Sequence, residues 1–413
     1  MTLATIVEQV LGPDLPIGFR AYDGSSLGPP DAPATIVVRN PDAIRRIVTA
    51  PGELGLARAY VAGDLELEGD VFALLELRDR LPHVRIGRQQ VVQLARTLGR
   101  SALRRLPPPP EEARPHGRAH TKARDAETIA HHYDVGNDFY RLVLGPAMTY
   151  SCAVFTRPDE SLERAQANKH ELVSRKLALR PGMRLLDVGC GWGSMALHAA
   201  RHHGADVVGV TLSHEQAEAA AKRMIDADVD QQVDIRIQDY RDVQDGPFDA
   251  ISSIGMFEHV GASRMAEYFR RLHALLPPGG RLLNHAISRP PGTRARFSRA
   301  GFLQRYVFPD GELHEVGAVV SAIQDAGFEV RHVETLREHY AITLRHWVAN
   351  LEKHWSEAVH LAGEGRAKVW RLYMAGSAAA FEDGRTQVHQ VLAVKPDGGT
   401  SGMPLRPDWD LLA

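Results

Sequence analysis

The C-terminal two thirds of the chain alternates short apolar runs with longer amphipathic segments. Apolar runs predict buried strands at 184–188, 205–210, 233–237, 248–254 and 281–287. Helical spacing of apolar residues between these runs predicts helices at 194–202, 215–226 and 263–276. Strands that alternate with helices of this length indicate an α/β fold with a doubly wound, mostly parallel sheet. Such a sheet binds ligands beyond the carboxyl ends of its strands, where the strand order reverses.

The first 105 residues have a pattern of their own. It predicts strands at 35–39 and 63–70 and helices at 41–48 and 54–61. The four consecutive prolines Pro107–Pro110 cannot continue a helix and favour extended chain. The predicted organisation is a small α+β domain at 1–105, a proline-rich basic linker at 106–120 and a further domain at 121–413.

The composition excludes several classes of protein. The 413 residues include 49 Lys+Arg and 51 Asp+Glu, a net charge of −2 that argues against a nucleic-acid-binding protein. No run of about 18 apolar residues predicts a membrane span, and the N-terminus lacks the basic start of a signal peptide. Cys152 and Cys190 cannot form a disulfide framework and lack zinc-ligand spacing, so no metal site is expected. We expect a cytoplasmic enzyme.

Basic residues are concentrated around the linker. Between residues 78 and 124 there are twelve Lys or Arg and three Asp or Glu. The first interpretation is a solvated helix face followed by a linker. The second is a patch for an anionic membrane surface, because apolar residues between 91 and 103 alternate with the arginines as in amphipathic membrane-binding helices. The second interpretation predicts a peripheral membrane protein.

The strongest local motif lies at the end of the first strand of the C-terminal part. Asp187-Val188-Gly189-Cys190-Gly191-Trp192-Gly193 joins that strand to a helix. Glycine at every second position lets the backbone approach a ligand. The spacing differs from that of dinucleotide-binding loops, and Asp187 is placed to orient a cationic amino-acid or sulfonium group. The motif predicts binding of S-adenosylmethionine.

The next two strand ends carry further candidates for cofactor binding. Ser213 and Gln216 form a capping box for the following helix, which is a structural role. The acid that usually holds the ribose is missing there, so Thr211 and Gln216 are the available substitutes. After the third strand, Asp239 and Tyr240 suit the edge and face of an adenine, although such a pair alone would be an ordinary loop.

Further segments complete a resemblance to a known family. They are His131–Tyr140, Met148–Phe155, Gly255–Gly261, Asn284–Ile287 and Glu338–Leu344. With Asp-Val-Gly-Cys-Gly-Trp-Gly, the motifs Tyr-Ser-Cys-Ala, Gly-Met-Phe-Glu-His-Val-Gly and His-Tyr resemble the cyclopropane-fatty-acyl-phospholipid synthase family, which includes the mycolic-acid cyclopropane synthases. The resemblance covers roughly residues 120 to 395. It implies a Rossmann-like class I methyltransferase domain that uses S-adenosyl-L-methionine.

The resemblance also implies roles for individual residues. The implied cofactor-binding residues are Tyr150, Ser151, Leu185, Asp187, Gly189, Cys190, Gly191, Gly193, Thr211, Leu212, Gln216, Asp239, Tyr240 and Arg241. The implied catalytic residues are Glu258, His285, Tyr340 and Cys152, the last through its backbone. They match the pocket that holds a bicarbonate ion in the family.

These residue types suit alkylation of an isolated double bond. The alkene attacks the sulfonium methyl group and leaves a carbocation, which needs nearby negative charge and then loses a proton. A small anion held by a carboxylate, a histidine and a tyrosine in a dry site can meet both needs. The alternative for His285 is an ordinary core histidine, but its predicted place at a carboxyl strand end beside Glu258 favours a functional role.

Several departures from the family pattern narrow the expected product. Ser377 stands where the family usually has a cysteine, which excludes a covalent cysteine mechanism, and Asn284 and Ala286 replace Leu and Thr. With the N-terminal domain, these departures resemble the actinobacterial fatty-acid methyltransferases that make 10-methylene stearate, the precursor of tuberculostearic acid. Ring closure to a cyclopropane is the alternative, and a small-molecule N- or O-methyltransferase or a lipid-binding scaffold is more remote.

The expected partners follow from this resemblance. They are a membrane phospholipid with an unsaturated acyl chain and the anionic membrane surface around it. A separate reductase is expected because the chain shows no nicotinamide or flavin fingerprint. The domain at 1–105 is expected to face the lipid. Paired lipid-facing modules prolong residence on a membrane, which favours a homodimer.

Overall fold

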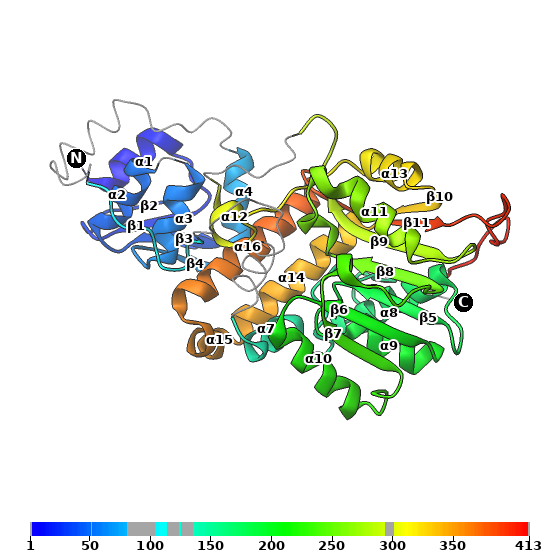
Figure 1. Ribbon diagram of the computed structural model, residues 1–413. Coiled ribbons are helices and arrows are strands. Elements are labelled where there is room, and N and C mark those ends of the chain that lie inside the picture. Colours follow the sequence, from blue (N-terminus) through cyan, green and yellow to red (C-terminus); the bar gives the residue numbers. More distant parts are fainter. Residues whose placement is uncertain are drawn as a thin grey trace. The chain divides into compact units, whose positions relative to one another are not determined.

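The computed structural model describes residues 2–50, 52–80, 104–113, 124, 135–293 and 301–411 (Figure 1). The chain forms two compact units, each assembled from several segments. The first comprises residues 1–114, 298–309 and 355–379, and the second comprises 115–297, 310–354 and 380–413. Most of the basic segment, part of the predicted linker and residues 131–134 lie outside the described residues, so the predictions made for them stay predictions.

The first unit contains a four-stranded sheet in the order β2-β1-β3-β4. Its strands are β1 (Gly18–Ala21), β2 (Ser26–Leu27), β3 (Ala34–Val38) and β4 (Leu65–Gly69). Helix α1 (Leu3–Leu11) precedes these strands, α2 (Pro41–Thr49) and α3 (Glu53–Val61) connect β3 to β4, and α4 (Val71–Arg80) follows β4. The Asn40 side chain accepts from the Asp42 N–H and caps α2, with Pro41 in its first turn. The expected small α+β fold is therefore present, with each predicted element within two residues of its observed bounds.

Later parts of the chain also belong to the first unit. They include α12 (Phe302–Tyr306), α15 (Trp355–Ala362) and most of α16 (Glu364–Glu382). Arg371 of α16 donates to the carbonyl oxygens of Leu67 (3.1 Å) and Gly69 (2.9 Å) on β4. Lys368 of the same helix forms an ion pair with Glu66. Strand β4 is an edge strand, whose free carbonyl groups could otherwise pair with another chain. The contacts from Arg371 provide hydrogen-bond donors for two of these carbonyls.

The second unit contains a seven-stranded sheet in the order β10-β11-β9-β8-β5-β6-β7. The strands are β5 (Arg184–Val188), β6 (Asp206–Thr211), β7 (Val233–Ile237), β8 (Ala250–Ile254), β9 (Arg281–Ser288), β10 (Glu329–Thr335) and β11 (Gln387–Val394). Strands β5 to β9 are parallel, whereas β11 is antiparallel to both β9 and β10. This confirms the predicted doubly wound, mostly parallel sheet.

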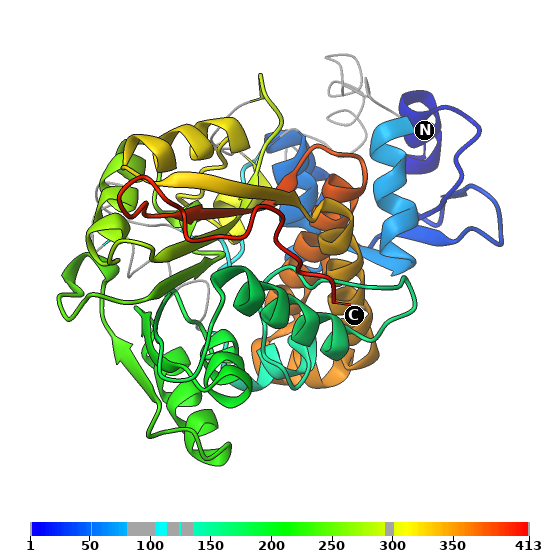
Figure 2. The same ribbon diagram turned by 90° about the vertical axis from the view of Figure 1, so that its right-hand side faces the viewer.

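Helices cover both faces of this sheet (Figures 1 and 2). They are α8 (Leu162–Leu177), α9 (Ser194–His203), α10 (His214–Asp226), α11 (Met265–Ala274) and α13 (Val316–Asp325), with α7 (Asn137–Leu144) and α14 (Arg337–Lys353) in the same unit. Leu185 packs with residues of α8, α9 and α10, whereas Leu186 packs with residues of α11 and α13. Because strand side chains alternate between faces, Asp187 points to the same face as Leu185.

The strand order reverses between β5 and β8. In this class of sheet the ligand binds beyond the carboxyl ends of the strands at such a reversal. The glycine loop 189–193 follows β5, and residues 255–261 with the short helix η3 (Phe257–His259) follow β8. Both motifs therefore lie at the edge where a ligand is expected. None of the helices among the described residues is both long enough and apolar enough to cross a membrane.

Candidate functional site

The glycine loop after β5 has the backbone conformation that only glycine adopts easily. Gly189, Gly191 and Gly193 have φ angles of 76°, 55° and 74°. A Cβ at Gly189 would lie 2.9 Å from Met256, and one at Gly193 would lie 2.9 Å from the Met224 methyl group. At Gly191 the nearest atom is Gln216 Nε2 at 4.0 Å. The outer glycines thus pack against protein, whereas the middle one faces space that a ligand can fill.

Asp187 and Lys169 place two buried charges behind this loop. Asp187 is 2% exposed, and Ser252 Oγ donates to its carboxylate at 2.7 Å. Lys169 of α8 is 1% exposed, and its Nζ donates to Ser151 Oγ at 3.1 Å. Burial raises the pKa of Asp187 to about 6 and lowers the pKa of Lys169 to about 7. The two groups influence each other electrostatically, so each favours the charged form of the other.

The sequence prediction missed Lys169 as a functional candidate. A lysine in an amphipathic helix is normally expected on the surface. The available signal was its spacing from Gln166, since residues three apart share a helix face. Gln166 Nε2 donates to the Ser151 carbonyl oxygen at 2.9 Å, and Lys169 donates to the Ser151 hydroxyl. Two side chains of α8 therefore hold the predicted cofactor-binding residue Ser151 in place.

The end of β6 forms the predicted capping box. Ser213 is the N-cap of α10, and its hydroxyl accepts from the Gln216 N–H at 3.2 Å. Thr211 Oγ1 donates to Gln216 Oε1 at 2.9 Å, which leaves the Gln216 amide nitrogen toward Gly191. The structure thus brings Thr211 and Gln216 together beside the glycine loop, with Leu212 half-buried between them in the chain.

Three residues that interact with one another follow β7. Asp239 caps the short helix η2 (Tyr240–Asp242) and forms an ion pair with Arg241, with 2.5 Å between Oδ2 and Nη2. The Arg241 guanidinium lies 5.5 Å from the centre of the Tyr240 ring. The three residues therefore interact within one turn, and their role toward adenine stays a prediction.

Glu258 lies in the short helix η3 that follows β8, and its carboxyl group is buried. The β8–β9 register ends at the pair Ile254 and His285, so the Ile287 N–H lies beyond the end of β8. Glu258 Oε1 accepts from that N–H at 2.8 Å. Its other oxygen, Oε2, is buried and has no hydrogen-bond partner among the described residues. Burial raises the pKa of the Glu258 carboxyl to about 7.

His285 lies on β9, on the same face as Ile287 and roughly 6.6 Å from it along the strand. Gln390 of β11 donates to His285 Nδ1 at 3.2 Å, and its amide orientation is fixed because Lys176 donates to Oε1 at 2.6 Å. The proton of the neutral ring is therefore assigned to Nε2, a buried atom without a partner in the described part of the chain. Burial, with Lys169 and Lys176 nearby, holds the pKa of His285 well below its usual range.

Cys152 and Tyr340 meet at the beginning of α14. The Cys152 thiol lies 3.5 Å from the Leu336 carbonyl oxygen, which also accepts from the Tyr340 N–H at 3.1 Å. The Ala153 N–H donates to Thr343 Oγ1 at 3.1 Å, so the segment after Ser151 runs along this helix. Burial raises the pKa of the Cys152 thiol well above its usual range, which keeps it protonated and unreactive.

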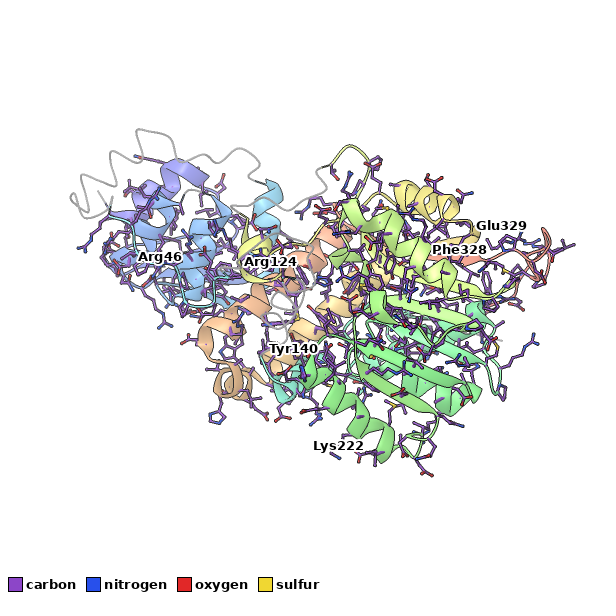
Figure 3. All side chains as sticks on the ribbon, viewed as in Figure 1. Arg46, Arg124, Tyr140, Lys222, Phe328 and Glu329 are labelled. Carbon is purple, nitrogen blue, oxygen red and sulfur yellow. The ribbon has the colours of Figure 1, made fainter. Side chains whose placement is uncertain are left out.

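A continuous series of aromatic rings joins the glycine loop to Tyr340. Its successive members, with the distances between ring centres, are Trp192 to Tyr140 (4.6 Å), Tyr140 to Tyr150 (6.0 Å), Tyr150 to Trp347 (5.3 Å) and Trp347 to Tyr340 (6.0 Å). Tyr140 of α7, labelled in Figure 3, is fully buried. This series, named here the aromatic wall, makes the surroundings of the predicted site apolar. Faces of such rings also attract cations.

The predicted site residues thus fall into groups that the fold assembles. Ser151 and Asp187 are linked through Lys169, Thr211 through Gln216, and Glu258 and His285 through β9. Tyr150 and Tyr340 are linked through Trp347.

Comparison with known proteins decides the family. The sequence profile described as mycolic acid cyclopropane synthetase matches residues 120–391. The chain belongs to this family. It is 48% identical over 406 residues to a "probable fatty acid methyltransferase" of Mycobacterium tuberculosis, with 95% of each chain covered. It is 42% identical over 391 residues to a protein of the same description from Pseudomonas putida, with 92% of each chain covered.

Solved structures of this methyltransferase family share the fold of about two thirds of this chain. A cyclopropane synthase of M. tuberculosis matches with a TM-score of 0.62 at 36% identity, covering 65% of this chain and 98% of that one. A mycolic acid cyclopropane synthase complexed with S-adenosylhomocysteine and CTAB matches with a TM-score of 0.61 at 34% identity, covering 65% and 98%. The fold is therefore that of the class I S-adenosylmethionine-dependent methyltransferases. The two fatty acid methyltransferases match over nearly the whole chain, beyond the range of the family profile.

Proposed function

We propose that this protein transfers a methyl group from S-adenosyl-L-methionine to the cis double bond of an unsaturated phospholipid acyl chain and forms a methylene-branched chain. The observation that carries the proposal is the pair of buried, complementary atoms Glu258 Oε2 and His285 Nε2, which lack partners among the described residues. They follow β8 and lie on β9, next to the strand that ends in the glycine loop. Methyl transfer to a polar amine or hydroxyl has no evident use for this pair.

The residues present fit the cofactor. Gly191 leaves room where any other residue would place a Cβ, and Gln216 borders that room. Asp187 and Lys169 supply opposite charges behind the loop, which suit the amino-acid part of the cofactor. The bound cofactor supplies an electrophilic sulfonium methyl group. Ser151, held by Gln166 and Lys169, would also contact the cofactor.

The residues present also fit a small anion such as bicarbonate. His285 offers Nε2–H as a donor, and Glu258 with a pKa of about 7 can offer a proton from Oε2 at neutral pH. An anion bound between them would supply negative charge close to a carbocation and a base for its proton. Such electrostatic stabilisation is strongest in a site without water. The orientation of His285 is set by Gln390, and that of Glu258 by the Ile287 N–H.

The aromatic wall supports an apolar, cation-forming substrate. Its rings would exclude water around the acyl chain and attract positive charge on the sulfonium group and on the substrate. Tyr340 would line the reacting region, whereas Cys152 acts through its backbone and packing, since its thiol stays protonated. Similarity over nearly the whole chain to proteins described as probable fatty acid methyltransferases supports a fatty-acyl substrate.

The membrane and partner predictions belong to the same proposal. The basic segment at 78–124 would bring the enzyme to an anionic bilayer as a peripheral protein. A methylene product would require a separate reductase to become a saturated branched chain. Paired copies of the N-terminal domain in a homodimer would lengthen residence on the bilayer.

The test uses the full-length chain with methyl-labelled cofactor and vesicles of oleoyl phospholipid, with stearoyl vesicles as the matched control. We expect label in oleoyl chains only. Mass spectrometry and NMR of the product then distinguish an exocyclic methylene from a cyclopropane ring, which would indicate ring closure instead. Absence of label from oleoyl chains, or equal activity on water-soluble amines, would contradict the proposal.

A further inference from the structure

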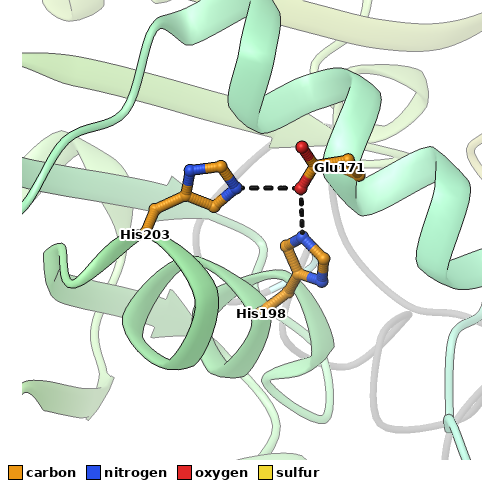
Figure 4. Close-up of side chains that lie close together, drawn as sticks. All are labelled: Glu171, His198 and His203. Atoms are coloured by element: carbon orange, nitrogen blue, oxygen red, sulfur yellow. Dashed lines mark hydrogen bonds and ion pairs between the residues drawn. The ribbon is translucent and has the colours of Figure 1, made fainter. Parts of the chain in front are cut away.

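A second cluster of reactive side chains lies away from the predicted site, between α8 and α9 (Figure 4). His198 Nε2 and His203 Nε2 of α9 lie 3.2 Å and 2.9 Å from the same oxygen, Oε2 of Glu171 on α8. The three ligand atoms all lie within 4.8 Å of one another. Two imidazoles and one carboxylate from two helices thus converge on one point.

The carboxylate is oriented by a further residue. Arg175, one turn along α8, donates from Nε to Glu171 Oε1 at 2.7 Å. This contact leaves Oε2 directed at the two imidazoles. Metal-binding carboxylates are commonly oriented by such a hydrogen bond from a neighbouring residue. The side chains of Glu171, His198 and His203 are 28%, 12% and 17% exposed. An ion and a water molecule can therefore reach the cluster from solvent.

We propose that Glu171, His198 and His203 form a binding site for one zinc ion. Two imidazole nitrogens and one carboxylate oxygen are a donor set that suits zinc, with water as the fourth ligand. In tetrahedral zinc sites neighbouring ligand atoms lie roughly 3.3–3.6 Å apart, given metal–ligand bonds of about 2.0–2.2 Å. The two nitrogen–oxygen distances of 2.9 Å and 3.2 Å therefore need to open by at most about 0.7 Å.

The ion would join the two helices that support the cofactor loop. Helix α9 begins directly after Gly193, and α8 carries Gln166 and Lys169, which hold Ser151. Cross-linking α8 to α9 would stabilise both supports without placing the metal near the reacting atoms. His198 and His203 follow Glu171 by 27 and 32 residues, so no short sequence motif predicted the site.

The competing explanation is a hydrogen-bonded group in which Glu171 accepts one bond from each imidazole and no metal is needed. Substitution by glutamine separates the two explanations. The glutamine amide can donate a hydrogen bond to Glu171 but is a poor zinc ligand. The substitutions are therefore His198→Gln and His203→Gln. The matched control is His202→Gln, an exposed histidine of the same helix whose ring lies 4.6 Å from that of His198 but which is not one of the three converging ligands.

The experiment titrates chelator-treated full-length protein with Zn²⁺ in competition with a chromophoric chelator, and with Co²⁺ followed by visible absorption. We expect one tight equivalent of Zn²⁺, tetrahedral Co²⁺ bands and a thermal midpoint raised by about 3–5 °C. His198→Gln and His203→Gln should lose all three effects while remaining folded by circular dichroism, and His202→Gln should keep them. Absence of a stoichiometric equivalent, its persistence in either ligand variant, or its loss in His202→Gln would overturn the assignment.

Discussion

The polar groups at neighbouring strand ends of the second unit differ in whether their buried atoms have hydrogen-bond partners within the protein. Around the cofactor loop, Asp187 bonds Ser252, Thr211 bonds Gln216 and Asp239 bonds Arg241. After β8, Glu258 Oε2 and His285 Nε2 are buried without a partner among the described residues. A buried polar atom without a partner costs about 1–3 kcal/mol. The polar groups at the cofactor end are therefore bonded to one another, apart from Gln166 Oε1, whereas Glu258 Oε2 and His285 Nε2 remain available to the anion that we propose.

The largest effect should come from removing the ionisable group of that pair. In Glu258→Gln we expect turnover to fall by about 10³-fold, because the variant can no longer exchange a proton at Oε2. The affinity for S-adenosylhomocysteine, measured by calorimetry, should stay within a few-fold. Glu312→Gln is the matched control, since Glu312 is also buried and accepts a backbone N–H, that of Ala262, at 2.7 Å. A parallel loss of cofactor affinity would assign Glu258 to the cofactor instead.

The pH dependence of stability should report the same buried carboxyl. The pKa of Glu258 rises from 4.5 to about 7 on folding, so between these values the unfolded chain binds fewer protons than the folded one. The free energy of unfolding therefore falls as pH rises through this window, by roughly 3 kcal/mol from this group. Urea unfolding of wild type and Glu258→Gln at pH 5 and pH 8, without bicarbonate, measures the difference. Equal changes in both proteins would show that the carboxyl is solvated.

A smaller effect is expected at the cofactor end. Lys169→Met removes the donor to Ser151 and the positive charge beside Asp187, and should weaken cofactor binding about tenfold. Lys176→Met is the matched control, because Lys176 is equally buried on α8 but contacts Gln390 and Glu334. Its cofactor affinity should be unchanged. Equal losses in the two variants would indicate a general effect of removing a buried charge.

The smallest expected effect is a difference in cofactor affinity and stability between alanine variants of two glycines in the cofactor loop. Gly191→Ala places a methyl group in open space and should weaken cofactor binding several-fold, with about 1–2 kcal/mol lost from its positive φ. Gly193→Ala carries the same strain and also meets Met224 at 2.9 Å, so it should lose more stability and less affinity. Thermal unfolding and calorimetry on both variants measure the contrast. The reverse order would mean that Gly191 packs against protein.

Local features of the fold were predictable from the sequence. The bounds of β5 and β7 match the prediction, and the Ser213 cap forms as expected, because these features depend on residues a few positions apart. The strand β11 was not predicted. It lies between β9 and β10 and brings Gln390 to His285, 105 residues away in the sequence. No local pattern encodes such a pairing.

The residues of the candidate site also divide into those that the sequence indicated and those that only the structure revealed. Glycine spacing and the position of Asp187 indicated the cofactor loop, and resemblance to the family indicated Glu258, His285 and Tyr340. Lys169 and the aromatic wall were missed, since their meaning depends on which side chains the fold buries together. The wall joins residues from α7, the Tyr150 segment, the glycine loop and α14, separated by up to about 200 positions.

The sequence by itself determined the succession of strands β5 to β9 along the chain, the glycine loop and the residue types available for chemistry, because hydrophobic periodicity and backbone preferences act over short distances. Tertiary structure alone decided which polar atoms are buried and which of them find partners. Burial in turn set the pKa values of Glu258, Asp187 and Lys169 and the proton position of His285, since charge is stabilised or penalised by surroundings that distant segments provide.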